Sequence, residues 1–263
     1  MNPVEFQNVT FAYETEPVLT GITLALPPGV TSLTGPNGAG KTTFLLLASG
    51  RVLPSSGTVL LEGRDTALLD EVEKNRLCSL VYQNMEFETE EPLGELLNFV
   101  FFNGFLPASD KSIVKDVVAA FELEALLGRK TQSLSKGEMQ RAVMAFSLLY
   151  GSRVVVMDEP VFALEEAQKH RALGFLTDYA HGAGISFLYS AHELDLTRKF
   201  SDQVLLFREG GHPLLGTAAE LLTRETLEAA YQVPYALLHH KEKLHRSALV
   251  DLPTPREALE HKG

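Results

Sequence analysis

The stretch GPNGAGKTT, from Gly35 to Thr43, decides the fold of this chain. It matches the pattern G-x-x-x-x-G-K-[ST], with the β-rich run VTSLTG before it and a helical run from about Lys41 to Ser49 after it. Glycines in such a loop let successive backbone N–H groups point at phosphate oxygens, and the helix N-terminus adds a partial positive charge. The pattern therefore predicts a phosphate-binding loop between a strand and a helix.

The fixed positions of this loop have separate expected tasks. Lys41 is expected to reach the β- and γ-phosphates of a nucleotide, and the Thr42 hydroxyl is a ligand for Mg²⁺. A chance glycine turn is the alternative interpretation, and the strand–loop–helix context argues against it. The residues predicted to bind the nucleotide here are Gly35, Asn37, Gly38, Gly40, Lys41, Thr42 and Thr43.

Two adjacent carboxylates, Asp158 and Glu159, follow the apolar strand run VVVM. Because neighbouring strand residues point to opposite sides, we expect the two carboxylates to have separate tasks. Asp158 is expected to hold Mg²⁺ through its water shell, and Glu159 to polarise the attacking water as a general base or a positioning group. A solvated strand end is the alternative, and the upstream phosphate loop argues against it.

The bulk composition narrows the class of protein. A formal net charge of −11 argues against a nucleic-acid partner and against docking to anionic lipid by charge alone. The single cysteine, Cys78, excludes an intrachain disulfide and is expected to be a small core residue in a reducing compartment. The stretch MNPVEFQ lacks the features of a signal peptide, and no apolar run approaches the ~20 residues needed to span a bilayer.

Apolar strands interleaved with helices are typical of a mainly parallel sheet covered on both faces. We therefore predict an α/β fold, a P-loop NTPase core with an N-terminal antiparallel β region and an inserted α-helical subdomain. The expected division assigns 1–85 and 151–225 to a RecA-like nucleotide-binding core that includes the β region, and 86–150 to the helical subdomain. The remaining 226–263 are expected to be a small C-terminal tail with two strands and a loose charged end.

Five motifs stand in one order along the chain: GPNGAGKTT, the glutamine of VYQN, LSKGEMQR, VVVMDEP and the histidine of LYSAHE. This order resembles the nucleotide-binding subunit of ABC transporters over about residues 3–225. The stretch LSKGEMQR separates that family from other P-loop ATPases. The resemblance implies hydrolysis of ATP with Mg²⁺ as the cofactor.

The roles of further residues are implied by this resemblance. Tyr13 fits the aromatic residue that stacks on adenine, with a simple strand-end aromatic as the alternative. Gln83 fits the glutamine that contacts Mg²⁺ or water and links the site to the helical subdomain, and His192 fits the histidine that meets the γ-phosphate. The residues implied in catalysis are Glu159, His192 and Gln83, and those implied in metal binding are Thr42, Gln83 and Asp158.

The stretch LSKGEMQR is implied to act across a dimer. In this family two subunits face each other head to tail, and the signature residues of one complete the ATP site of the other. Hydrolysis then opens the dimer, which is a ligand-driven population shift. The residues implied to act in this way are Leu134, Ser135, Lys136, Gly137 and Glu138.

Two stretches depart from the family pattern. Lys136 and Glu138 stand where the family has L-S-G-G-Q, and 162–165 reads FALE where the family usually has S-A-L-D. A positive φ at Lys136 would cost about 1–2 kcal/mol, but the cost vanishes if Lys136 begins a helix that Ser135 caps, which we favour. The resemblance implies that both stretches serve the opposite subunit, so an asymmetric heterodimer is an alternative to the favoured homodimer.

A phenylalanine-rich stretch at 87–105 is the expected contact for a membrane partner. By the resemblance it forms a groove for a helix of a transmembrane permease, with core packing as the alternative. The tail resembles importer ATPases for iron chelates, haem and cobalamin. This implies a subunit held by its permease at the cytoplasmic face of the plasma membrane, served by an extracytoplasmic binding protein. A soluble ABC ATPase for iron–sulfur cluster assembly is the alternative, and His239, His240 and His245 are expected to be solvated rather than metal-binding.

Overall fold

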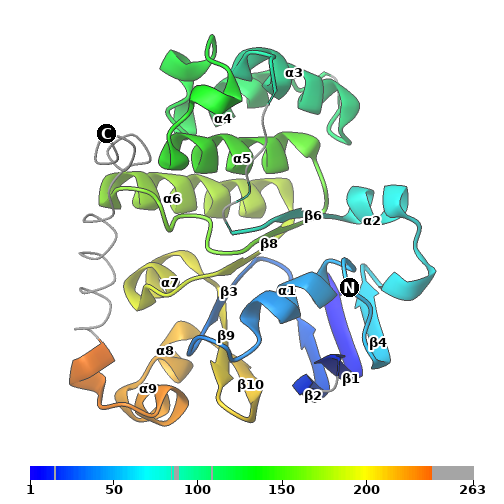
Figure 1. Cartoon of the computed structure of the whole chain (residues 1–263), viewed down its shortest axis with the longest axis vertical. Helices are drawn as coiled ribbons and strands as arrows, with labels where there is room; N and C mark the ends of the chain where they lie inside the picture. Colours follow the sequence, from blue (N-terminus) through cyan, green and yellow to red (C-terminus); the bar gives the residue numbers. More distant parts are fainter. Residues whose placement is uncertain (15, 84, 86–88, 108, 239–263) are drawn as a thin grey trace, which may run out of the picture.

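The chain folds around two β-sheets with a block of helices at one end (Figure 1). The computed structural model describes residues 1–14, 16–83, 85, 89–107 and 109–238. Its strands are β1 (Val4–Tyr13), β2 (Glu16–Leu26), β3 (Val30–Thr34), β4 (Ser56–Leu61), β5 (Arg64–Asp65), β6 (Cys78–Val81), β7 (Val154–Met157), β8 (Ser186–Ser190), β9 (Gln203–Arg208) and β10 (Gly211–Gly216). Its helices are α1 (Lys41–Ala48), α2 (Glu71–Leu77), α3 (Leu93–Asn103), α4 (Ser112–Ala120), α5 (Lys136–Tyr150), α6 (Glu166–Ala183), α7 (Leu194–Phe200), α8 (Ala218–Leu221) and α9 (Arg224–Tyr231), with short 3₁₀ turns η1 (Thr66–Leu68), η2 (Glu124–Leu126) and η3 (Thr131–Ser133).

The larger sheet has the strand order β10-β9-β3-β8-β7-β6. Its neighbours from β9 to β6 are parallel, whereas β10 pairs antiparallel with β9. β3 leads into the phosphate loop, β7 leads into the carboxylate pair, and β8 lies between them. Because the carboxyl ends of parallel strands open onto one edge, this order brings the predicted site residues together there.

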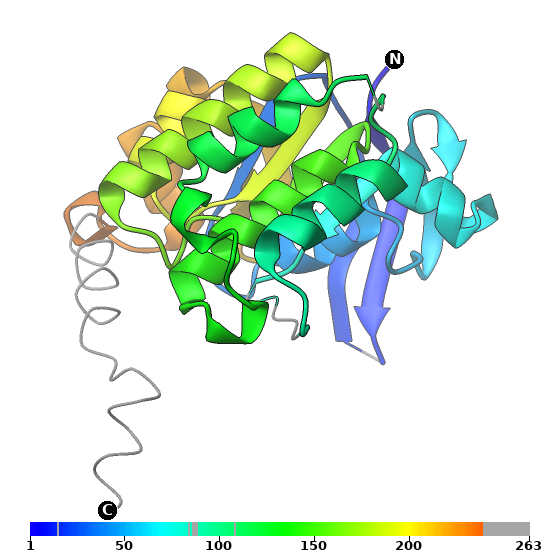
Figure 2. The same ribbon diagram turned by 90° about the horizontal axis from the view of Figure 1, so that it is seen from above.

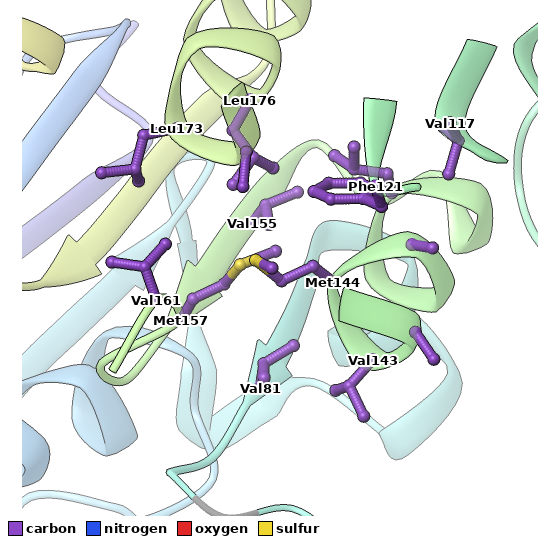
Figure 3. Packing of buried hydrophobic residues seen from close by; sticks show 14 of the residues in the cluster. Val81, Val117, Phe121, Val143, Met144, Val155, Met157, Val161, Leu173 and Leu176 are labelled. Carbon is purple, nitrogen blue, oxygen red and sulfur yellow. The ribbon is translucent and has the colours of Figure 1, made fainter. Parts of the chain in front are cut away.

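Alternate residues of β7 divide between two hydrophobic cores. Val154 and Val156 belong to the core that contains α1, whereas Val155 and Met157 belong to the core that contains α5 and α6. Figure 3 shows Val155 and Met157 close to Met144 of α5 in this second core. Because strand side chains alternate with a period of two, helix α1, which follows the phosphate loop, and helix α5, which begins within the signature stretch Leu134–Glu138, lie on opposite faces of the sheet.

The smaller sheet has the order β2-β1-β4-β5 and is antiparallel throughout. Helices α3, α4 and α5 lie between β6 and β7 in the chain, and from above they lie over the rest of the fold (Figure 2). The predicted α/β fold class, with its antiparallel β region and inserted helices, is confirmed. Among the described residues, none of the helices combines the length and apolarity that a bilayer span requires.

The prediction of two strands in the tail is wrong for the described part, 226–238. Helix α9 runs through the expected boundary at 225/226, and residues 235–238 are helical. Leu227 and Ala230 are buried at helical spacing in a cluster with residues of β9, which explains the helix. Pro234 stands just before the next helical turn, where its fixed φ is well tolerated. His239, His240 and His245 lie outside the described residues.

Local features of the fold include the end of α4 and the burial of Cys78. Helix α4 ends at Ala120, and Glu122, two residues later, adopts a left-handed φ of 52°. Cys78 is fully buried, as expected, and burial raises the pKa of its thiol to about 12. The short helices α2 and α7 and the edge strand β10 were not among the predicted elements.

Candidate functional site

The phosphate loop follows β3 and has a backbone that requires glycine. Gly35 adopts a φ of 134°, and a Cβ on it would lie 2.5 Å from the carbonyl oxygen of Phe207. Gly38 and Gly40 adopt φ values of 79° and 94°, which L side chains rarely adopt. Gly40 also stands at the N-cap of α1 without a side chain to cap it. The first-turn N–H groups of α1 are therefore free of a side-chain cap, which fits an anion such as a phosphate.

Lys41 is buried at the start of α1, with its ammonium group inside the loop. Its Nζ donates to the carbonyl oxygens of Gly35 at 2.8 Å and Pro36 at 2.9 Å. Burial lowers the pKa of Lys41, and the nearby carboxylates of Glu159 and Asp158 oppose that shift. The ammonium is thus held by neutral carbonyls, which phosphate oxygens can replace.

Asp158 lies directly opposite the phosphate loop. The Thr42 hydroxyl donates to its Oδ2 at 2.7 Å, and the Ser190 hydroxyl donates to its Oδ1 at 2.5 Å. The contact between Thr42 and Asp158 places a hydroxyl and a carboxylate side by side beneath the loop. Such oxygen donors suit a hard divalent cation, so these residues fit Mg²⁺.

Glu159 is held by two of the other residues predicted for catalysis. Gln83 Nε2 donates to its Oε2 at 2.8 Å, and His192 Nε2 lies 2.7 Å from its Oε1. The prediction that strand alternation separates the two carboxylates is wrong, because strand β7 ends at Met157 and both residues lie beyond it. The separation arises because Glu159 itself adopts a left-handed φ of 49°.

Tyr13 lies apart from this hydrogen-bonded cluster. It ends β1 with about half of its surface exposed, and its ring packs edge-on against Phe11 at a centroid distance of 4.9 Å. One end of the antiparallel sheet thus presents an aromatic ring to solvent. This geometry leaves a ring surface that a planar base can stack on.

The signature stretch begins α5 and is fixed by a capping box. The Ser135 hydroxyl accepts from the Glu138 N–H at 3.3 Å, and the Glu138 carboxylate accepts from the Ser135 N–H at 2.7 Å. Lys136 is the first helical residue and does not adopt a positive φ. Of the two alternatives for Lys136, the strained one is therefore excluded. Glu138 fits its position because a glutamate at N3 completes the box as glutamine would.

The two stretches that depart from the family pattern contact each other. A Cβ on Gly137 would lie 2.9 Å from the carbonyl oxygen of Ala163, so the start of α5 approaches the 162–165 loop closely. Gln140 joins them further: its Nε2 donates to the Glu159 carbonyl oxygen, and its Oε1 accepts from the Ala163 N–H, both at 2.9 Å. Gln140 was not among the residues predicted from the sequence, where its only local signal is its position two residues after Glu138.

Two more contacts to the site come from distant parts of the chain and were also missed. The Ser190 hydroxyl accepts from the Glu159 N–H at 2.8 Å, in addition to its bond to Asp158. The Tyr231 hydroxyl of α9 accepts from the Gly35 N–H at 3.0 Å and lies 3.1 Å from the Thr34 hydroxyl. Ser190 had a weak signal as a hydroxyl two positions before His192, whereas nothing local in the sequence points to Tyr231.

The phenylalanine-rich stretch is divided between core and surface. Phe101 is buried, whereas Phe99 and Phe102, three residues apart on α3, are 64% and 58% exposed. Phe105 packs edge-on against Tyr150, with 5.2 Å between the ring centroids. Beside α3, a cavity of about 160 Å³ opens towards α4. Phe87 lies outside the described residues.

A glycine loop before an uncapped helix, with a hydroxyl–carboxylate pair below it, defines a P-loop nucleotide-binding protein. A family model described as "ABC transporter" matches residues 19–162, more than half of the chain. The chain belongs to this family and is an ATP-binding ATPase. The predicted resemblance and the predicted enzyme class are thereby confirmed.

Known relatives agree with this assignment. The hemin import ATP-binding protein of Pseudomonas aeruginosa is 32% identical over 91% of this chain and 96% of its own length. The nickel import ATP-binding protein of Rhodobacter capsulatus is 34% identical over 85% of this chain and 92% of its own length. A dimeric ATP-binding cassette solved in a post-hydrolysis state with ADP and Pi has the same fold, with a TM-score of 0.71, 21% identity, and coverage of 82% of this chain and 98% of its own.

Proposed function

We propose that this chain is the ATP-hydrolysing subunit of an ABC importer, which dimerises head to tail around two ATP molecules and drives a membrane permease. The observation that carries the proposal is the contact of Glu159 with both Gln83 and His192, beside the Asp158–Thr42 pair. The relatives named as hemin and nickel import ATP-binding proteins support import as the direction.

The phosphate side of the proposed site consists of the loop and α1. The first-turn N–H groups of α1 and the Lys41 ammonium bind the β- and γ-phosphates, and Tyr13 stacks on the adenine. Thr42, Asp158 and Gln83 are the residues that would hold Mg²⁺, and the ion would neutralise developing charge on the phosphates. Their oxygen donors and the neighbouring Lys41 fit a magnesium–phosphate group.

The hydrolytic side of the proposed site centres on Glu159. Among the described residues, Gln83 donates to one of its carboxylate oxygens and His192 lies beside the other, and each oxygen retains lone-pair capacity for an attacking water. Glu159 polarises that water, and His192 turns between Glu159 and the γ-phosphate. Holding the carboxylate from two sides reduces the reorganisation needed when the water attacks.

The signature stretch completes the ATP site of the facing subunit. The Ser135 hydroxyl accepts within its own capping box, so its hydrogen can donate outward to a phosphate oxygen. The backbone N–H groups of Lys136 and Gly137 lie at the start of α5. This positive end of the helix dipole faces the same phosphate. Since this contribution comes from hydroxyl and backbone groups, a homodimer is the favoured assembly.

The permease docks on the exposed face of α3, where Phe99 and Phe102 offer two apolar rings. This contact holds the chain at the cytoplasmic face of the membrane, and an extracytoplasmic binding protein delivers the substrate from the other side. The alternative, a soluble ABC ATPase for iron–sulfur cluster assembly, gives these two exposed rings no task.

Fractionation of the source cells tests this proposal. We expect the chain in the membrane fraction, where it co-purifies with a polytopic protein, and we expect Phe99→Ser with Phe102→Ser to release it. The matched control is Leu68→Ser with Val72→Ser, which removes two exposed apolar side chains elsewhere on the surface. Recovery of the wild-type chain with cytosolic scaffold proteins alone would favour the alternative.

A further inference from the structure

Ser190 is a buried hydroxyl between the two carboxylate residues of the site. It ends β8, is 1% exposed, and its Oγ donates to Asp158 Oδ1 at 2.5 Å. The same oxygen accepts from the Glu159 N–H at 2.8 Å. A hydroxyl has one donor hydrogen and acceptor lone pairs, so this side chain can serve both neighbours at once.

The sheet register explains why Ser190 reaches both residues. β7 and β8 are parallel neighbours, with Met157 opposite Tyr189. One step further along both strands, Asp158 and Ser190 therefore stand opposite each other at the edge of the sheet. The Thr42 hydroxyl holds the other carboxylate oxygen of Asp158 from α1, so this carboxylate is held from the helix and from the sheet.

Glu159 is held at two points by the same short segment. Ser190 binds its backbone N–H, and His192, two residues further on, contacts its carboxylate at 2.7 Å. The backbone of Glu159 has a left-handed φ of 49°, which a non-glycine residue adopts only when its surroundings hold it there. The bond from Ser190 is one of the contacts that hold this conformation.

We propose that Ser190 is a positioning residue for ATP hydrolysis, which fixes Asp158 and Glu159 relative to each other. The proposal rests on the proposed function of these two residues. Through Asp158, Ser190 sets the position of the metal-binding oxygen. Through its bond to the Glu159 N–H, Ser190 sets the backbone conformation of Glu159 and so the direction of the water-polarising carboxylate. Ser190 itself touches neither the nucleotide nor the water.

Kinetics of the purified full-length chain test this role. Ser190→Ala leaves Asp158 Oδ1 and the Glu159 N–H without this partner. Because hydrogen bonds to charged groups are the stronger ones, we expect kcat to fall about tenfold. We also expect the Mg²⁺ concentration for half-maximal rate to rise several-fold. The affinity for ATP in EDTA should stay within about twofold of wild type, because Lys41 and the α1 N–H groups are unchanged.

A control variant separates positioning from a general loss of packing. Ser79→Ala removes another buried hydroxyl bond of the same sheet, the 2.8 Å contact between Ser79 of β6 and Ser147 of α5. This change is expected to lower the melting temperature without altering the Mg²⁺ requirement. A Ser190→Ala variant that loses no more kcat than Ser79→Ala, at an unchanged Mg²⁺ requirement, overturns the proposal.

A second pair of variants keeps the test valid if Ser190→Ala does not fold. Ser190→Thr and Ser190→Val have nearly the same shape and differ in the hydroxyl. We expect the threonine variant to turn over about tenfold faster than the valine variant, and equal rates overturn the proposal. Failure of the proposed function is a different result: the wild-type chain would lack ATPase activity, or Glu159→Gln would be as active as wild type.

Discussion

The proposed nucleotide site of the chain and the surface proposed to face a second subunit are built differently. In the first, side chains from separate elements converge, and Asp158 is hydrogen-bonded by Thr42 of α1 and Ser190 of β8. In the second, the signature stretch is fixed within one helix turn by the Ser135–Glu138 capping box. A convergent site depends on the identity of each side chain, whereas a helix terminus offers backbone N–H groups that most residues supply equally well. This difference explains how the chain can carry Lys136 at the start of α5, where the backbone N–H group is retained.

The two regions are nevertheless joined. Gln140 connects the helix of the signature stretch to the Glu159 carbonyl oxygen and to the Ala163 N–H. Gly137 allows the close approach that this connection requires, since a Cβ there would lie 2.9 Å from the Ala163 carbonyl oxygen. A change at the start of α5 can therefore reach Glu159, the proposed hydrolytic carboxylate, through the 159–163 segment.

The largest effect is expected in the convergent site. Glu159→Gln removes the water-polarising group but keeps its shape, so we expect kcat to fall by about 100-fold or more while ATP still binds. Size-exclusion chromatography with ATP should then detect a trapped dimer. Glu166→Gln, an exposed glutamate of α6, is the control and should behave as wild type. Normal turnover by Glu159→Gln would contradict the catalytic assignment.

Lys41→Ala tests the phosphate side of the same site. The substitution removes a charge that is held inside the loop by the Gly35 and Pro36 carbonyl oxygens, and we expect ATP affinity to fall by about tenfold or more. Equilibrium titration with a fluorescent ATP analogue measures this directly. Lys111→Ala, an exposed lysine, controls for the loss of one positive charge. Unchanged affinity in Lys41→Ala would mean that the backbone N–H groups alone hold the phosphates.

Gln140→Ala tests the connection between the two regions. It leaves the Glu159 carbonyl oxygen and the Ala163 N–H without this partner, so kcat is expected to fall by about three- to tenfold, with a smaller change in ATP affinity. Gln132→Ala, which truncates an exposed glutamine in η3, is the matched control. If both variants turn over at the same rate, the two regions act independently of each other.

Lys136→Gly is expected to have the smallest effect. Lys136 already has a helical backbone at N1, so glycine restores the family residue without relieving strain, and kcat should change by less than about twofold. Turnover and ATP-dependent dimerisation are to be measured on the chain purified alone. A sharp rise in turnover would identify a weakened signature and favour the heterodimer alternative.

The sequence by itself determined those parts of the site whose geometry is local. The loop from Gly35 to Thr43 was predictable because its glycines and Lys41 act within nine consecutive residues of strand, turn and helix. The start of α5 was predictable for the same reason, since a capping box spans four residues. The two strands expected in the tail were wrong for its described part, because the fold there depends on how α9 packs against β9.

Tertiary structure alone decided how the separate motifs are held together. Glu159 follows Asp158 directly in the sequence, but its direction comes from a left-handed backbone and a bond to Ser190, 31 residues away. Tyr231 reaches Gly35 across 196 residues. Such contacts follow from the strand order β9-β3-β8-β7, which places chain segments side by side according to burial of the whole sheet, and no local pattern encodes that order.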